Sequence, residues 1–300
     1  MEKQFLTIKE QVELLESRGV RTDNETSAVL QREGYYAVVN GYKSFFVYRT
    51  TATGDEFRRG TAFKEIHRLF LFDRSLRMDL FRYTAIIEAY MRTTVSYRLA
   101  EANDGLTSFY LDPSTYRDDG NYQGQVNRLI DNLTSILNNK NRRPYIEHYQ
   151  SKYGAVPIWV LANSMAFGQT LRLFSFQKEH LRKRIAQDFS DRYRMDNVSK
   201  WRIGSPQVLD ALDNINAARN ICAHDERLYC ARFSQGNLSF VDILDDMDIF
   251  LSESDSRHLR GTIRRSVDGC LRRIDSIPRE GLLRKMGVES LHEIEKRRRS

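Results

Sequence analysis

The sequence predicts an all-α fold, and three observations lead to that prediction. Apolar residues return every three or four positions in nearly every long segment, as they do on the buried face of an α-helix. Capping residues, glycine or a Ser-Pro pair flank several of these segments, as they flank helices. Hydrophobic residues make up 41% of the 300 residues, which is ample for a core.

Two short helices are expected at the start. Thr7 and Glu10 form a capping-box pattern before KEQVELLESR, and Gly19 ends that helix. A second helix is expected from about Asn24 to Arg32, ending at Gly34.

An aromatic stretch, LQREGYYAVVNGYKSFFVY, follows, and its glycines interrupt helical periodicity. We interpret it as a tightly packed connection in the core. The alternative is an exposed surface on which nucleic-acid bases stack.

The longest helical pattern runs from Thr61 to Ala102, with apolar residues at three- and four-residue steps. So long a stretch is expected to bend near Asp73 or to be two helices. Further helices are expected at 123–137 and from Pro144, a residue suited to a first helical turn.

The apolar run IWVLANSMAFGQTLRLFSF, interrupted by Gly168, reads as buried helix. Ser205 and Pro206 begin the helix that carries Arg219. The segment 233–244 is ambiguous, and a short hairpin around Gly236 is possible there. Helical spacing returns at 259–274, and EIEKRRRS reads as a frayed basic tail.

Three regions summarise this organisation. Residues 1–60 form an N-terminal helical and aromatic-rich segment, 61–230 a helical core, and 231–300 a C-terminal helical extension with a basic tail. We expect them to form one continuous globular unit.

The composition limits the classes of function. The net charge of +7 rests on arginine clusters, which favour a polyanion such as nucleic acid, although simple solubility explains the charge equally well. The three cysteines have no zinc-site spacing and fit a reducing cytosol. No apolar stretch has the length of a membrane span, so we expect a soluble, cytoplasmic protein without metal or cofactor.

The segment RNICAHDERLY is the main candidate site. Asn220 and His224 lie four residues apart, on one face of a helix, and Arg219 and His224 could reach one phosphate if the helix ends near Ala223. Arg227 adds a cation on the next turn.

Two considerations weaken a reading from spacing alone. Histidine and arginine are favoured at helix C-termini because they complement the helix dipole. A second Arg-x4-His match, Arg143 to His148, contains Pro144 and is treated as chance.

RNICAHDERLY resembles the R-N-x-x-x-H signature of HEPN-domain ribonucleases. Other stretches resemble, in order from Phe5 to Tyr229, the AbiD/AbiF type of the abortive infection (Abi) family of bacterial phage-defence proteins. They are FLTIKEQVELLESRGV, LQREGYYAVVNGYKSFF, LFDRSLRMDLFRYTAIIEAYMRT, HYQSKYGAVPIWVLANSMAFGQTLRLF and ARNICAHDERLY.

The resemblance implies a HEPN-like helical bundle with additional N- and C-terminal helices, and metal-independent RNA cleavage. Arg219, Asn220 and His224 would be catalytic. Histidine can act as acid or base near neutral pH, arginine can bind phosphate, and asparagine can orient the histidine or the RNA.

One histidine does not easily serve as acid and base together, so cleavage is expected to need a second copy of the motif. Relatives often show an arginine followed by histidine near Arg92, but here Tyr97 and Arg98 stand at those positions. We therefore expect a homodimer, with Arg92, Arg98 and Arg227 binding RNA.

The favoured function is a ribonuclease toxin of antiphage defence. RNA would be its substrate, and a cognate regulatory RNA could be a second RNA partner. The alternative is a non-catalytic RNA-binding or regulatory protein with a HEPN-like fold. A plain helical scaffold would leave the Arg-Asn-His arrangement unexplained.

Overall fold

A computed structural model describes residues 4–52, 54–139, 141, 143–196 and 203–296. The all-α prediction is confirmed, since 69% of the structure is helical and strands contribute one two-stranded sheet to the described ranges. The basic tail at 297–300 lies outside the described residues.

The chain forms two compact units, each built from separated segments. Unit 1 contains Met1–Leu80, Ile221–Asp242 and Arg257–Arg297. Unit 2 contains Phe81–Asn220, Ile243–Ser256 and the last three residues. Helices α3 and α9 each begin in one unit and end in the other.

Unit 1 begins with α1 (Ile8–Ser17) and α2 (Thr26–Glu33), both as expected. Thr7 Oγ1 accepts the N–H of Glu10, and the Glu10 carboxylate accepts the N–H of Thr7, which is the predicted capping box. Gly19 and Gly34 follow these helices with φ of 87° and 82°, backbone that glycine adopts without strain.

The aromatic stretch contains a π-helical turn at Tyr36–Asn40 and a 3-10 turn at Lys43–Phe45. Tyr42 and Phe46 are buried, as the packed-connection reading requires, but Tyr36 and Tyr48 are 80% and 70% exposed. Only some of the aromatic side chains in this stretch therefore belong to the core.

The sheet is an antiparallel hairpin of β1 (Val47–Thr51) and β2 (Gly54–Phe57), which the sequence did not predict. Arg49 pairs with Glu56 across it at 2.8 Å. The short hairpin considered around Gly236 is reduced to a single antiparallel bridge. Residues 234–236 form a 3-10 turn closed by one bridge, Phe233 to Leu238, because the chain enters a helix two residues later.

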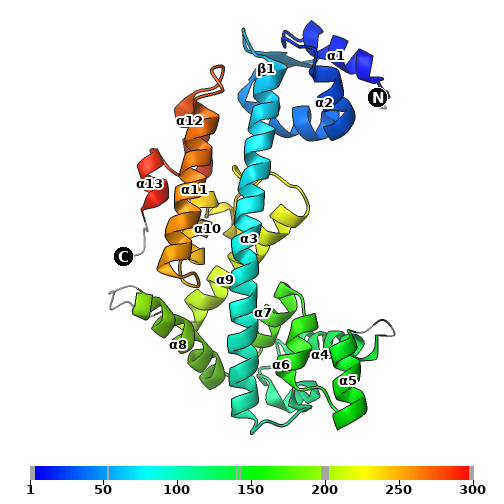
Figure 1. Ribbon diagram of the computed structural model, residues 1–300, viewed down its shortest axis with the longest axis vertical. Coiled ribbons are helices and arrows are strands. Elements are labelled where there is room, and N and C mark those ends of the chain that lie inside the picture. Colours follow the sequence, from blue (N-terminus) through cyan, green and yellow to red (C-terminus); the bar gives the residue numbers. More distant parts are fainter. Residues whose placement is uncertain (1–3, 53, 140, 142, 197–202, 297–300) are drawn as a thin grey trace. The chain divides into compact units, whose positions relative to one another are not determined.

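Helix α3 (Phe63–Ala102) is unbroken, so the two-helix alternative is wrong. Asp73 lies inside it, and its charge is matched by partners described below rather than by a break in the helix. In Figure 1, α1, α2 and β1 gather around the first half of α3.

Polar side chains also hold the C-terminal helices, the first of which begins in unit 2 and continues in unit 1. The Glu65 carboxylate accepts the N–H of Asp275 at 2.8 Å and of Ser276 at 3.2 Å. Arg260, 2% exposed, donates to the carbonyl of Ile294 at 2.9 Å. The segments are α11 (Glu253–Leu271), α12 (Arg279–Met286) and α13 (Leu291–Glu295).

Unit 2 surrounds the second half of α3. Its helices are α4 (Gln123–Asn138), α5 (Pro144–Tyr153), α6 (Ile158–Leu161), α7 (Phe167–Ser175), α8 (Glu179–Asp196) and most of α9 (Ser205–Ala223), and α10 (Phe240–Met247) begins in unit 1 and ends in unit 2. Short 3-10 turns at 109–111, 113–115 and 162–164 join them.

The apolar run 158–176 is not one helix, contrary to expectation. It breaks at Met165 and Ala166, whose backbone is extended, and Gly168 lies inside α7. The Asn163 side chain donates to the carbonyl of Trp159 at 3.0 Å. This contact satisfies a carbonyl at the end of α6 and favours the break.

Candidate functional site

Helix α9 carries the Arg219–Ala223 part of the motif. Val208, Leu212, Ile215 and Ala218 form its buried stripe. The helix ends at Ala223, and His224 is the first residue beyond it and is exposed to solvent. Asp225 follows with φ of 57°, which turns the chain sharply.

A buried carboxylate in unit 1 holds the chain after His224. Asp73 Oδ1 accepts the N–H of Tyr229 at 2.7 Å, and both oxygens lie within 3.2 Å of the Leu228 nitrogen. Asp73 is completely buried. Burial raises its pKa, an effect that these donors and Arg77 oppose.

Arg77 lies one helical turn after Asp73 and completes this anchor. Its Nη1 lies 2.8 Å from Asp73 Oδ2 and 3.1 Å from the carbonyl oxygen of Glu226, and its Nη2 pairs with Asp225. The Tyr42 hydroxyl donates to Asp73 at 2.7 Å. We call Tyr42, Asp73 and Arg77 the buried anchor.

His224 borders a hollow of about 580 Å³ within unit 1, which we call the His224 hollow. The Arg227 guanidinium donates to the carbonyl of Gly41 at 2.9 Å, which ties the far side of the turn to the aromatic stretch. The lining residues are Tyr36, Ala37, Asn40, Gly41, Tyr42, Phe70, His224, Asp225, Glu226, Arg227, Cys230 and Ala231.

This hollow contains the imidazole of His224 and the guanidinium of Arg227. The ring of Tyr36, which also lines it, is exposed. The hollow therefore combines a histidine, an arginine and an accessible aromatic ring.

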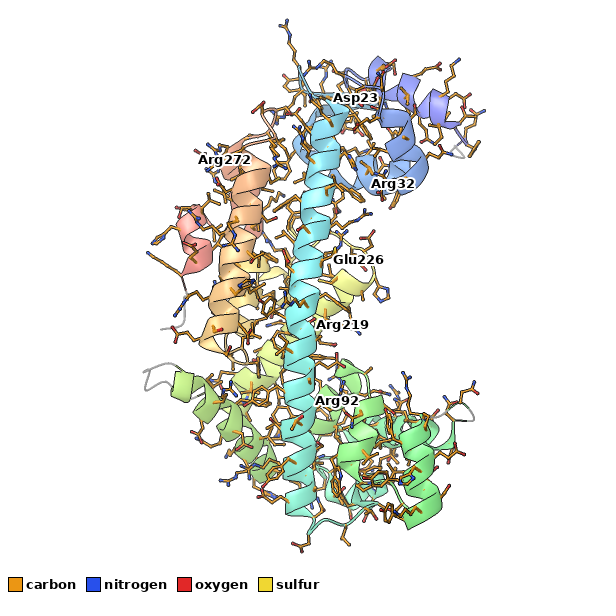
Figure 2. The ribbon with its side chains drawn as sticks, in the orientation of Figure 1. Asp23, Arg32, Arg92, Arg219, Glu226 and Arg272 are labelled. Carbon is orange, nitrogen blue, oxygen red and sulfur yellow. The ribbon has the colours of Figure 1, made fainter. Side chains whose placement is uncertain are left out.

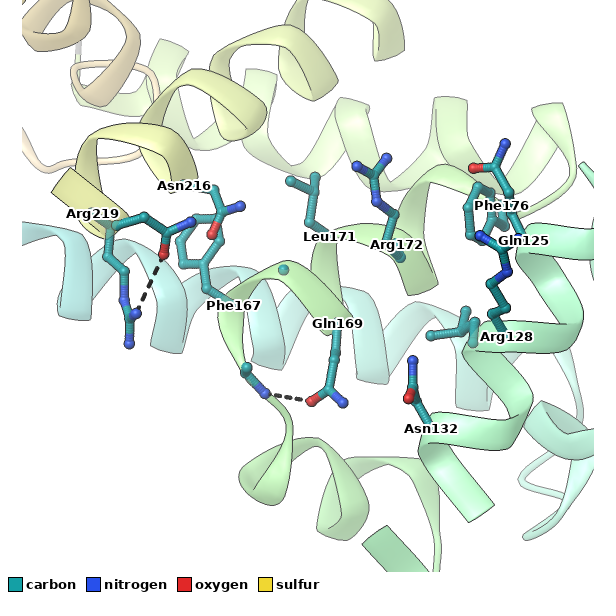
Figure 3. Close-up of a pocket in the computed structure, with 14 residues that line it drawn as sticks. Gln125, Arg128, Asn132, Phe167, Gln169, Leu171, Arg172, Phe176, Asn216 and Arg219 are labelled. Atoms are coloured by element: carbon teal, nitrogen blue, oxygen red, sulfur yellow. Dashed lines mark hydrogen bonds between the residues drawn. The ribbon is translucent and has the colours of Figure 1, made fainter. Parts of the chain in front are cut away.

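Arg219 and Asn220 line a different hollow, within unit 2, which we call the Arg219 hollow (Figure 3). Arg219 Nη1 lies 3.5 Å from Asn220 Oδ1, and its guanidinium carbon lies 5.5 Å from the ring centre of Phe81. Arg219 and Arg92 are both labelled in Figure 2, on α9 and α3. The structure thus brings Arg219 and Asn220 together and places His224 at another hollow.

Arg92 and Arg98, expected to bind RNA, already have acidic partners in unit 2. Arg92 lies 2.8 Å from Glu88. Arg98 lies 2.6 Å from both Asp188 and Glu101, and these carboxylates raise its pKa further above that of free arginine. Their RNA-binding role stays a prediction.

The second Arg-x4-His match is arranged differently. Arg143 precedes α5, and Pro144 occupies the first turn as expected. The ring of His148 packs edge-on against Tyr149 and Tyr153, with ring centres 5.8 and 6.3 Å apart. Neither residue lines the two hollows described above.

Sequence reasoning missed the buried anchor and Tyr36. The signal for the anchor was present in LFDRSLR, because Asp73 and Arg77 are four residues apart and Asp73 falls on the apolar stripe of α3 between Leu69 and Leu76. A charged pair on a buried stripe needs partners, and those partners are the backbone after His224.

In the described ranges, no cluster of three His, Cys, Asp or Glu side chains suits a metal ion, and no helix has the length and apolarity of a membrane span. A model of the family described as "Abi-like protein" matches residues 28–230. No curated protein and no solved structure matches the chain.

Proposed function

Because the chain belongs to the Abi-like protein family, we propose that it acts in abortive infection, as an endoribonuclease of bacterial antiphage defence. The R-N-x-x-x-H segment would be the site of a HEPN-type, metal-independent cleavage of RNA. The reaction would begin with attack of a ribose 2′-OH on the adjacent phosphodiester.

The observation that carries this proposal is the solvent-exposed His224, directly after α9, on a turn fixed by the buried anchor. A general acid or base must be accessible and still held in one place. Asp73 accepts two consecutive backbone N–H groups of that turn, so the imidazole stands on rigid backbone although its side chain is free.

The roles follow from the residue types. His224 would exchange the proton of the 2′-OH or of the leaving 5′-oxygen, and Arg219 would stabilise the charge on the phosphate. In one chain these two side chains line different hollows, so the homodimer proposed below would have to bring them to one phosphate. Asn220 would orient the RNA or Arg219, whose guanidinium it faces at 3.5 Å.

Cleavage of this kind needs an acid and a base. Since the chain has one good copy of the motif, we propose that a homodimer supplies the second. The dimer is tested by light scattering at micromolar concentration, where a monomer would contradict it.

The decisive experiment incubates RNA with the purified protein in EDTA. We expect products with 2′,3′-cyclic phosphate and 5′-hydroxyl ends, and no cutting where the scissile nucleotide is 2′-deoxy. His224→Ala should abolish cleavage. His148→Ala is the matched control, because it removes a histidine from the other Arg-x4-His sequence, and it should cut like the wild type.

Two outcomes would contradict the proposal. If both histidine variants cut equally well, the activity would not belong to this segment. If a folded protein binds RNA and never cuts it, a non-catalytic RNA-binding function replaces catalysis.

A further inference from the structure

The Arg219 hollow is formed by three helices of unit 2, and Figure 3 shows the side chains that line it. Its α4 residues are spaced three and four apart, so they share one face of that helix. The polar side chains are Gln125, Arg128 and Asn132 of α4, Gln169 and Arg172 of α7, and Asn216, Arg219 and Asn220 of α9.

The charge of this hollow is entirely positive. Three arginines line it, and none of its lining residues is Asp or Glu. Arg128 and Arg172 are exposed and have no ion-pair partner among the described residues, unlike Arg98. The nearby carboxyl of Asp213 has its pKa raised by burial, an effect that Arg172 opposes.

Arg219 is held more firmly than the other two arginines. Its guanidinium lies over Phe81, and its buried Nε has no hydrogen-bond partner. Three guanidinium groups without a carboxylate in the same hollow make it a site for an anion with several oxygens, such as a phosphate.

Five carboxamides accompany these arginines, which a bare phosphate site does not need. Gln169 Oε1 accepts the N–H of Ala166 at 2.8 Å, which leaves the amide NH2 of Gln169 as a donor. Asn and Gln side chains pair with the edges of unstacked bases. Buried Phe167, Leu171 and Phe176 supply an apolar floor.

We infer that the Arg219 hollow binds a nucleotide, with Arg128 and Arg172 on its phosphate and the carboxamides on its base. Its volume of about 530 Å³ lies in the range of small-ligand pockets. The inference rests on the proposed function for the source of the nucleotide, an unpaired nucleotide of the RNA. A free mononucleotide has the same chemistry.

The test measures binding of a labelled single-stranded RNA to the full-length protein by fluorescence anisotropy. The RNA carries 2′-O-methyl groups, so that attack by a 2′-OH cannot destroy it. Arg128→Gln and Arg172→Gln should each raise Kd about tenfold, the loss expected for one charge-assisted hydrogen bond. Arg184→Gln, an exposed arginine of α8 outside the hollow, is the control and should change Kd less than about twofold.

A second readout separates phosphate contacts from structural damage. The slope of log K against log salt should fall by about 0.7 for each arginine removed, and a merely misfolded variant would not show that change. Asn132→Ala should keep the wild-type slope while it alters the preference among RNAs of different base composition.

Competition identifies the source. If AMP, GMP, CMP or UMP displaces the labelled RNA, the hollow binds nucleotides in general. If only unlabelled RNA displaces it, the hollow binds nucleotides within an RNA strand. Inorganic phosphate that competes as well as the nucleotides would overturn base recognition. Arg128 and Arg172 variants that bind like Arg184→Gln would overturn the inference.

This failure is distinct from failure of the proposed function. If the wild type cuts RNA and both arginine variants bind and cut normally, nucleotide binding in the Arg219 hollow is contradicted and the nuclease proposal stands. If the wild type binds nucleotides through the two arginines and never cuts RNA, the nuclease proposal is contradicted and nucleotide binding in the Arg219 hollow stands.

Discussion

Asp73 and Tyr229 are 156 residues apart in sequence, yet the carboxylate of the first accepts the backbone N–H of the second at 2.7 Å. This bond joins the middle of α3 to the turn that follows His224. It makes the position of the candidate catalytic histidine depend on a buried charge in another helix of unit 1.

Asp73→Asn should therefore destabilise the protein severely. The change leaves Arg77 without its fully buried anion, and breaking a buried pair of this kind costs about 3 to 5 kcal/mol. Denaturant unfolding measures the loss. Asp225→Asn is the matched control, because Asp225 pairs with the same guanidinium but is 61% exposed, and it should cost less than about 1 kcal/mol. Equal losses in both variants would contradict the anchor.

Tyr36→Ala should weaken RNA binding by about 1 to 3 kcal/mol, the contribution of one stacked base. Tyr36 is 80% exposed at the rim of the His224 hollow, so its loss should leave the melting temperature unchanged. Tyr48→Ala removes a ring that is 70% exposed on β1, outside the hollow, and should bind RNA like the wild type. Anisotropy titrations of the three proteins would show the difference, and identical curves would argue against stacking on Tyr36.

Acid should weaken unit 1 through Glu33. The guanidinium of Arg74, 2.7 Å away, and that of Arg32 lower the pKa of Glu33 to about 2. A carboxyl whose pKa is depressed in the folded state contributes stability above its unfolded pKa, and this stability is lost as pH falls from about 4.5 to about 2. At pH 7, Glu33→Gln should cost about 1 to 2 kcal/mol. Melting curves across that range should converge for the two proteins at the acid end, and a gap that persists there would be evidence against the assignment.

Gly287→Ala should destabilise unit 1 more than Gly60→Ala. Both glycines have positive φ, 93° and 88°, so both variants carry the left-handed penalty of about 1 to 2 kcal/mol. A Cβ at Gly287 would also lie 1.9 Å from Ser239 Oγ and 2.5 Å from its Cβ, whereas Gly60 faces open space. Overpacking of this kind adds about 1 to 3 kcal/mol. Denaturant midpoints that fall equally in both variants would show that the contact relaxes without cost.

The helices could be predicted because their signals are local. Thr7 with Glu10, and Pro144 at a first turn, mark helix starts within a few residues. Periodicity identified α3 but not its continuity, because Asp73 looks like an interruption until its partners at 228 and 229 are known. The β1–β2 hairpin was missed for a related reason, since exposed Tyr48 and polar Arg49 and Glu56 give no clear alternation.

The motif of the candidate site could be recognised in the sequence, but the surroundings of its residues could not be predicted. Spacing put Asn220 and His224 on one helical face, but α9 ends at Ala223 and leaves His224 beyond the helix. The hollows could not be foreseen, because the residues beside Arg219 come from α4 and α7 and those beside His224 come from the aromatic stretch. Such contacts depend on tertiary packing, which spacing along one helix does not contain.

The segmented composition of unit 1 has a consequence for synthesis on the ribosome. The first 80 residues must wait for 257–297 before their core is complete. At about 5 to 20 residues per second, the intervening stretch of 81–256 takes on the order of 10 to 35 seconds to translate. Throughout that interval Glu65 lacks the backbone of 275 and 276 that it binds in the finished protein. Unit 1 is therefore completed only when the last of its three segments has been made.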